Sequence, residues 1–161
     1  MSSNGFRAAM RRFPTGVTIV TTVVDGKPYG FTANAFTSVS AEPPMVLICV
    51  NREASAHPMI AQSSIFCVNI LSLEQTEIAK RFADHAARHD RFARVKTTVA
   101  TTGAPVIEGA LAFVDCRLAE EHTAGTHTVF IGSVVASGTR AGSPLGYFDA
   151  EYRDFGLEVA P

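Results

Sequence analysis

Residues 17–24 read Val-Thr-Ile-Val-Thr-Thr-Val-Val, an unbroken run of side chains that branch at Cβ. Branching at Cβ disfavours a helix and suits the pleated backbone of a strand. The run lies between Pro14-Thr15-Gly16 and Asp25-Gly26-Lys27-Pro28, which both have the composition of turns. We therefore predict a strand over residues 17–24 and a hairpin that leads into the segment beginning at Tyr29.

Further strands and short helices are expected along the rest of the chain. Strand-sized apolar runs cover residues 45–50, 66–70, 110–119 and 127–137. Pro43 and Pro44 have no amide hydrogen, so the first of these strands should begin after them. Helical patterns cover residues 6–13, 55–62 and 72–82, and the last opens with the capping-box spacing Ser-x-x-Gln. The polar residues 83–94 are expected to form a helix end and a mobile loop.

Strands and helices do not alternate regularly, and this decides the fold class. The pattern predicts a mainly β protein with a closed antiparallel barrel, Greek-key-like connections and a few flanking α-helices. A length of 161 residues suits one ordinary domain. We therefore expect a single domain over residues 1–161.

The charge balance excludes some partners. Lys and Arg number 14 and Asp and Glu number 15, and the basic residues are scattered, so no nucleic-acid partner is expected and an oligonucleotide-binding barrel is disfavoured. The N-terminus lacks the pattern of a signal peptide, and no apolar run reaches the length that spans a bilayer. We expect a cytoplasmic protein with no membrane partner.

Several common chemical sites are missing from the sequence. No G-x-G-x-x-G or G-x-x-x-x-G-K-[ST] motif is present, which disfavours Rossmann and P-loop enzymes. His85 and His89 are four residues apart but lack the Glu of H-E-x-x-H and a convincing third ligand, so no metal site is expected. Cys49, Cys67 and Cys116 lie singly in apolar runs, as reduced, buried thiols do.

Residues 30–40 form the segment with the most binding groups, Gly-Phe-Thr-Ala-Asn-Ala-Phe-Thr-Ser-Val-Ser. Its hydroxyls and amide offer hydrogen bonds, while Ala33 and Ala35 leave the backbone open to a neighbour. Such a segment can hold a flat ligand rich in nitrogen and oxygen. Alternatively, it is a half-buried strand and turn whose small polar groups satisfy one another.

The order of several motifs along the chain favours the first interpretation. Phe-Pro-Thr-Gly-Val at residues 13–17 is followed by Thr-Ala-Asn-x-Phe-Thr-Ser-Val-Ser at 32–40, Pro-Pro at 43–44, a strand ending at Asn51, and Gly-Thr-His-Thr at 125–128. Together these motifs, which span residues 6–152, resemble the flavin reductase-like family of FMN-binding split barrels. The resemblance implies a homodimer that reduces FMN or FAD with NADH or NADPH and supplies reduced flavin to a separate flavin-dependent monooxygenase.

The resemblance leaves other functions open. Some relatives pass electrons to another acceptor, such as a cobalt corrinoid, and a non-catalytic flavin- or haem-binding split barrel is a further alternative. The choices between FMN and FAD, and between NADH and NADPH, also stay open. Because a cofactor of this kind carries the reaction, few chemical groups are required of the protein itself.

The resemblance also implies a set of site residues. Flavin-binding positions would be Thr32, Ala33, Asn34, Ala35, Ser38, Ser40, Cys49, Asn51, Ser55, Arg81, Phe82, His127 and Tyr152. His127 would also meet the nicotinamide, which makes it the expected catalytic residue. Thr126 stands where the family usually has Asp, and a lone His at the start of a strand can instead be structural.

Overall fold

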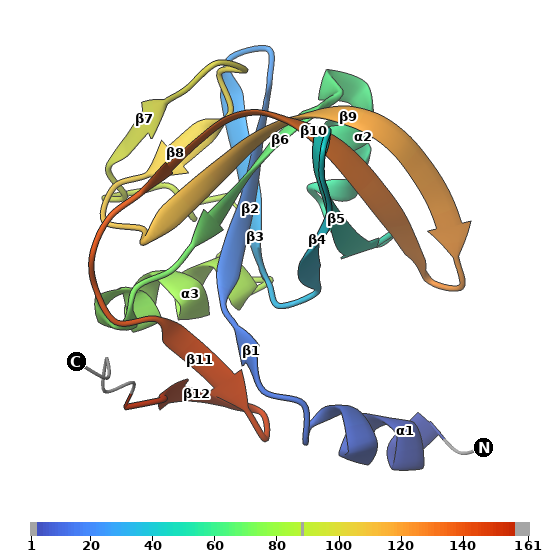
Figure 1. The fold of residues 1–161 in the computed structure, drawn as a ribbon, viewed down its shortest axis with the longest axis vertical. Coiled ribbons are helices and arrows are strands. Elements are labelled where there is room, and N and C mark those ends of the chain that lie inside the picture. Colours follow the sequence, from blue (N-terminus) through green and yellow to red (C-terminus); the bar gives the residue numbers. More distant parts are fainter. Residues whose placement is uncertain (1–2, 88, 157–161) are drawn as a thin grey trace.

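The computed structural model describes residues 3–87 and 89–156, and most of them form antiparallel strands (Figure 1). The predicted mainly β class is confirmed. The strands are β1 Thr15–Gly16, β2 Thr18–Val24, β3 Lys27–Ala33, β4 Phe36–Ala41, β5 Pro44–Asn51, β6 Ile65–Ile70, β7 Thr97–Val99, β8 Pro105–Ile107, β9 Ala112–Ala124, β10 His127–Thr139, β11 Leu145–Phe148 and β12 Glu151–Asp154. The helices are α1 Ser3–Met10, α2 His57–Ser63, the 3-10 turn η1 Leu73–Gln75 and α3 Thr76–Ala83.

The main sheet has seven strands in the order β3-β2-β6-β9-β10-β5-β4. Its two edges, β3 and β4, are consecutive in the chain, and only Asn34 and Ala35 separate them. The amide of Cys49 in β5 donates to the carbonyl of Ala35 at 3.1 Å. This bond ties the link to β5, the neighbour of the edge strand β4. The sheet is therefore rolled so that its edges meet at a seam.

The seam is not joined by a ladder, so the expected full closure is wrong while the split form of the barrel is confirmed. The reason lies in what covers β3. Thr32 Oγ1 donates to the carbonyl of Ala79 in α3 at 2.6 Å, and Arg91 donates to the carbonyl of Gly30 at 2.8 Å. Helix α3 and the loop after it thus occupy the edge that a closing strand would need.

Two apolar clusters hold the barrel and its cover together. Residues inside the barrel are Val20, Val46, Ile48, Val50, Ile60, Phe66, Val68, Cys116 and Phe130. A second cluster, Val17, Ile19, Leu71, Ala79, Phe82, Ile107 and Leu145, joins α3 to the outside of β2. Burial of these side chains contributes roughly 1.5–3 kcal/mol each for the larger ones. The second cluster fixes α3 beside the seam.

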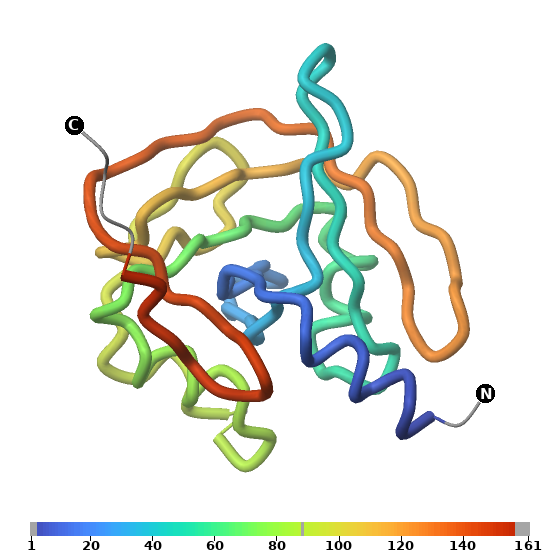
Figure 2. The backbone as a smooth tube through the Cα atoms, turned by 60° about the horizontal axis from the view of Figure 1, so that its bottom comes forward, coloured from blue at the N-terminus to red at the C-terminus, as the bar shows by residue number. Residues whose placement is uncertain are grey.

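Helix α1 differs from the other helices because none of its residues is buried. It lies beside the β11–β12 hairpin, where the amide of Asp149 donates to the carbonyl of Arg11 (Figure 2). The helix ends at Met10 rather than at the predicted Phe13, and Phe6, Met10 and Phe13 are 54%, 51% and 65% exposed. No helix among residues 3–87 and 89–156 is long and apolar enough to cross a bilayer.

Some element boundaries differ from the sequence-based expectations. Strand β5 begins at Pro44, opposite Ala41, because a proline in the first position of a strand does not interrupt the ladder. Strand β9 continues to Ala124, beyond the predicted strand end at residue 119, and turns within two residues into β10. The capping box predicted at Ser72 is present and opens η1, which continues into α3.

Candidate flavin site

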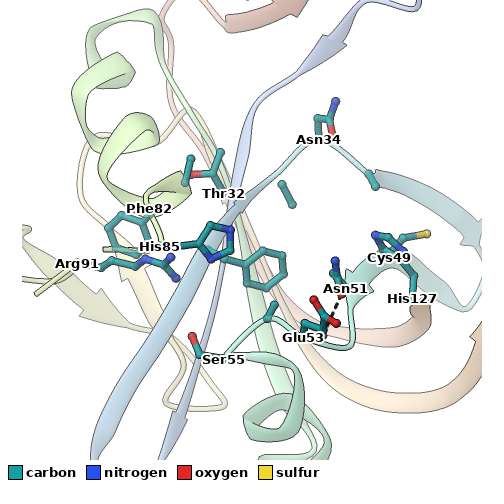
Figure 3. Close-up of a pocket in the computed structure, with 15 residues that line it drawn as sticks. Thr32, Asn34, Cys49, Asn51, Glu53, Ser55, Phe82, His85, Arg91 and His127 are labelled. Atoms are coloured by element: carbon teal, nitrogen blue, oxygen red, sulfur yellow. Dashed lines mark hydrogen bonds between the residues drawn. The ribbon is translucent and has the colours of Figure 1, made fainter. Parts of the chain in front are cut away.

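A cavity of about 520 Å³ lies at the seam of the barrel (Figure 3). Four parts of the chain line it: Phe31–Ala35 at the end of β3, Cys49, Asn51 and Glu53–Ser55 after β5, Phe82, Ala83, His85 and Arg91 from α3 and its loop, and His127 at the start of β10. Ligand pockets in proteins have volumes of roughly 300–1,000 Å³. The cavity therefore has the size of a ligand site.

The residues at the end of β3 form one wall of the cavity. Ala33 and Ala35 are small, so a flat ligand can approach the backbone there. The Thr32 hydroxyl donates to α3, which leaves only its acceptor capacity toward the cavity. Asn34 is exposed at the link to β4, where its carbonyl accepts from the amide of Phe36 at 3.1 Å. This wall combines hydrogen-bonding groups with open backbone.

A second wall forms where the end of β5 meets the start of β10. His127 pairs in register with Asn51, so the ladder itself brings these two residues together. Asn51 Oδ1 accepts from the amide of Glu53 at 2.9 Å and turns the chain away from the strand. His127 Nδ1 lies 2.9 Å from Thr126 Oγ1, which orients the exposed imidazole and leaves Nε2 for another ligand.

The opposite end of the cavity is cationic. Arg91 is 6% exposed, and its two terminal nitrogens donate to the carbonyls of Gly30 and Asp84, each at 2.8 Å. Burial lowers the pKa of Arg91, and the charge of Asp84 opposes that shift. Phe82 is fully buried beside it and packs edge-on against Phe92 at 5.0 Å between ring centroids. Figure 3 shows Arg91 and Ser55 on the side away from Cys49 and His127.

The cavity contains most of the residues that the resemblance implied. Thr32, Ala33, Asn34, Ala35, Cys49, Asn51, Ser55, Phe82 and His127 all line it. Their roles in binding stay predictions. Cys49 is half-buried there, whereas Cys67 and Cys116 are buried as expected.

Four implied residues lie elsewhere. Ser38 is exposed on β4, and Ser40 Oγ accepts from the amide of Glu42 at 3.2 Å. Arg81 is exposed and donates to the carbonyl of Ala93, so it braces the loop that carries Arg91. Tyr152 lines an adjoining cavity of about 180 Å³ that also includes Thr32. Their predicted contacts with a flavin remain predictions.

Sequence reasoning missed six lining residues, of which Arg91, His85 and Glu53 carry ionisable side chains. Arg91 and His85 belong to the polar stretch that was expected to be a loop, and no local pattern distinguishes a buried Arg from a solvated one. Gly30, whose carbonyl accepts a hydrogen bond from Arg91, is 61 residues away from it in the sequence. The one available signal was the position of this stretch directly after Phe82.

The lining residues fit a flavin nucleotide. A flat ring needs small neighbours and hydrogen-bonding groups, which Ala33, Ala35 and Asn34 supply. A phosphate needs a cation, and Arg91 is one whose Nε is buried without a hydrogen-bond partner in the described residues. No carboxylate forms an ion pair with Arg91 in that part of the chain. An anionic group at this end would offset a charge that the protein alone leaves unpaired.

The fold and the cavity together define a split-barrel protein with a cleft for a flat, phosphate-bearing cofactor. The sequence model of the family described as flavin reductase like domain matches residues 10–156. The chain therefore belongs to this family.

Two curated relatives and one solved structure illustrate the similarity. The chain is 39% identical to the reductase subunit HsaB of a flavin-dependent monooxygenase from Rhodococcus jostii, over 91% of this chain and 75% of that protein. It is 40% identical to the FMN reductase (NADH) RutF of Agrobacterium fabrum, over 92% of this chain and 86% of that protein. The structure also superposes on the NADH:FAD oxidoreductase SgcE6 of Streptomyces globisporus, which was solved in complex with NAD and FAD fragments. The TM-score is 0.90 at 36% identity, over 96% of this chain and 93% of that protein.

Proposed function

We propose that this protein is a flavin reductase that transfers a hydride from NAD(P)H to FMN or FAD and supplies the reduced flavin to a separate flavin-dependent monooxygenase. The observation that carries the proposal is the cavity at the seam, whose lining combines open backbone, an imidazole at one end and a buried cation at the other. Support also comes from relatives named as NADH-dependent FMN reductases and as reductase subunits of monooxygenases.

A bound flavin supplies the hydride-accepting ring, and the protein contributes position and shielding. Ala33 and Ala35, at the end of β3 and just after it, would let the ring approach the backbone, and Arg91 would hold the phosphate. His127 stands at the other end, oriented by Thr126, where it can hold the nicotinamide amide. Stacking two rings at roughly 3–3.5 Å provides the near-attack geometry that accelerates transfer. No obligatory proton donor is needed.

The assembly and location follow from the same proposal. We propose a homodimer because α1 and the turn after it expose three large apolar side chains, Phe6, Met10 and Phe13, which a partner subunit would bury. We place the protein in the cytoplasm, where its nicotinamide substrate is produced. We also propose that residues 1–161 act as a single domain.

Steady-state kinetics test the function directly. The purified protein should oxidise NADH or NADPH only when FMN or FAD is present. Asn34→Leu removes polar groups from the cavity and should raise the KM for flavin roughly tenfold. Thr98→Leu is the matched control, since Thr98 is exposed on β7 away from the cavity. Nicotinamide oxidation that is independent of added flavin, in flavin-free protein, would contradict the proposal.

A further inference from the structure

The 51–57 loop, which runs from the end of β5 to the start of α2, supplies part of the wall of the flavin cavity. Its lining residues are Asn51, Glu53, Ala54 and Ser55. In Figure 3, Asn51 and Glu53 lie between Ser55 and His127. The amide of Glu53 donates to Asn51 Oδ1 at 2.9 Å, and the amide of Ala54 donates to the carbonyl of Asn51 at 3.0 Å. These bonds shape the loop, but they do not fix its distance from β10.

Two hydrogen bonds tie the 51–57 loop to β10, one on each side of His127. The amide of Arg52 donates to the carbonyl of Thr126 at 3.0 Å. His57 Nε2 forms a hydrogen bond with the hydroxyl of Thr128 at 2.8 Å. The first bond joins two backbone groups, whereas the second joins two side chains and depends on their identity. The position of the loop relative to His127 is therefore set in part by His57.

The bond between His57 and Thr128 lies on the face of β10 that points away from the cavity. Successive side chains of a strand point to opposite faces, so Thr128 shares a face with Phe130, and both are buried. The His57 ring packs against Phe130 at 5.2 Å between ring centroids. His127 points the other way and lines the cavity, whereas His57 and Thr128 do not line it. His57 can therefore act on the site only by placing the loop and the strand.

The surroundings of this bond do not require polar side chains. Val50 lies opposite Thr128 in the ladder, and Val50, Ile60 and Phe130 all belong to the apolar cluster inside the barrel. A valine would fill the place of Thr128 in such a cluster, so packing alone does not explain the hydroxyl. A hydrogen bond between side chains is directional and fixes both distance and orientation, which apolar contact does not. The bond therefore adds precision to the placement of the loop.

We propose that His57 is a positioning residue for hydride transfer, which holds the 51–57 loop against β10 through Thr128. The flavin beside the loop and the nicotinamide at His127 thereby keep their alignment. The inference rests on the proposed flavin reductase function, because it assumes that the two rings meet in this cavity. A misplacement of about 1 Å by a distant mutation can slow a reaction roughly 100-fold, so loss of this bond should affect the rate.

The test removes either partner of the bond. Thr128→Val deletes the hydroxyl at nearly the same volume, and His57→Phe keeps a ring against Phe130 without its nitrogens. His57→Gln is the conservative variant, because its amide can bond the hydroxyl again. Thr22→Val is the matched control, since Thr22 is buried and its hydroxyl lies 2.7 Å from that of Ser63 at the other end of α2. Stopped-flow reduction of bound FMN at saturating NADH gives the limiting rate, and urea unfolding gives the stability.

We expect Thr128→Val and His57→Phe each to lower the limiting rate roughly fivefold, and the double variant to be no slower than either single variant. His57→Gln should reduce flavin within about twofold of the parent rate, and Thr22→Val should lose stability but no rate.

Three results would overturn this role of His57 in a protein that reduces flavin. Thr128→Val and His57→Phe could match the rate of Thr22→Val, their effects could multiply in the double variant, or His57→Gln could be as slow as His57→Phe. A parent protein that binds FMN but does not reduce it with NADH would overturn the proposed function, and this role with it.

Discussion

His127 is the residue at which position and chemistry can be separated. Its imidazole is exposed, held by Thr126, and placed at the cavity by the register of β10 with β5. If it positions the nicotinamide, His127→Ala should raise the KM for NADH and slow hydride transfer roughly tenfold, with little change in FMN affinity. Stopped-flow reduction of bound flavin isolates this step.

Two outcomes would contradict this role for His127. Reduction at the parent rate with subsaturating NADH would make the histidine structural. Complete loss of reduction with intact NADH binding would make it an obligatory chemical group.

At the scale of single residues, local motifs predicted most of the cavity lining and missed its buried cation. Thr32, Ala33, Asn34 and Ala35 were found because they are contiguous and lie in a segment of unusual composition. Arg91 reaches the cavity through a backbone contact with Gly30, and nothing near Arg91 in the sequence encodes that contact. Residues placed by long-range packing leave no local signal.

At the scale of elements, Gly30 controls how closely α3 approaches β3. A Cβ built there would lie 2.9 Å from Phe82 Cε1 and 3.0 Å from the carbonyl of Val20. Gly30→Ala should therefore destabilise the protein by about 1–3 kcal/mol and displace Phe82 from the cavity wall. Urea unfolding measures the first effect, and FMN affinity measures the second.

Gly16→Ala is the control for this substitution. A Cβ at Gly16 meets nothing within 4 Å, so its effect on stability should be within a few tenths of a kcal/mol. Equal stabilities for the two variants would contradict the close packing of α3 on β3.

Elements were more predictable than their assembly. β-Branched runs and turn sequences identified β2, β5, β6 and β10, because these signals are local. The short strands β7 and β12 were not predicted, since they are short and mostly exposed and carry little apolar pattern. The open seam was expected only from the family resemblance, because it depends on hydrogen bonds from α3 and its loop to β3 that no local pattern encodes.

At the scale of the whole molecule, buried thiols make the fold sensitive to alkali. Burial, and then the charge of Asp115, raises the pKa of Cys116 to about 12, and the same causes raise the pKa of Cys67 strongly. Thiols of the unfolded chain lose their protons near pH ~8.5. The unfolded state therefore binds fewer protons than the native state above that pH, and stability falls as pH rises toward 12.

Each thiol should remove about 2 kcal/mol of stability by about pH 10. Urea unfolding from about pH 7 to about pH 10 should show a smaller loss for Cys116→Ala than for the parent protein, because one of the two thiols is gone. The other alkaline groups are common to both proteins and cancel in the comparison. Identical pH dependences would contradict the burial of the Cys116 thiol.

The exposed apolar side chains of α1 and of Phe13, which follows it, determine the expected assembly. Light scattering at micromolar concentration should give the mass of a dimer, and Phe13→Glu should weaken the dimer because it places a charge in an apolar interface. Ala8→Glu adds the same charge at an exposed position of α1 outside the apolar residues. A monomeric parent protein would remove this role of α1.

The central claim is that the seam cavity holds a flavin and that nicotinamide reduces it there. The direct measurement is the absorption spectrum of the protein with FMN or FAD, recorded without oxygen before and after addition of NADH. We predict that the flavin absorbance bleaches, and that Asn34→Leu requires more flavin for the same bleaching. A Soret band in the purified protein, or a flavin spectrum that NADH leaves unchanged, would contradict the account.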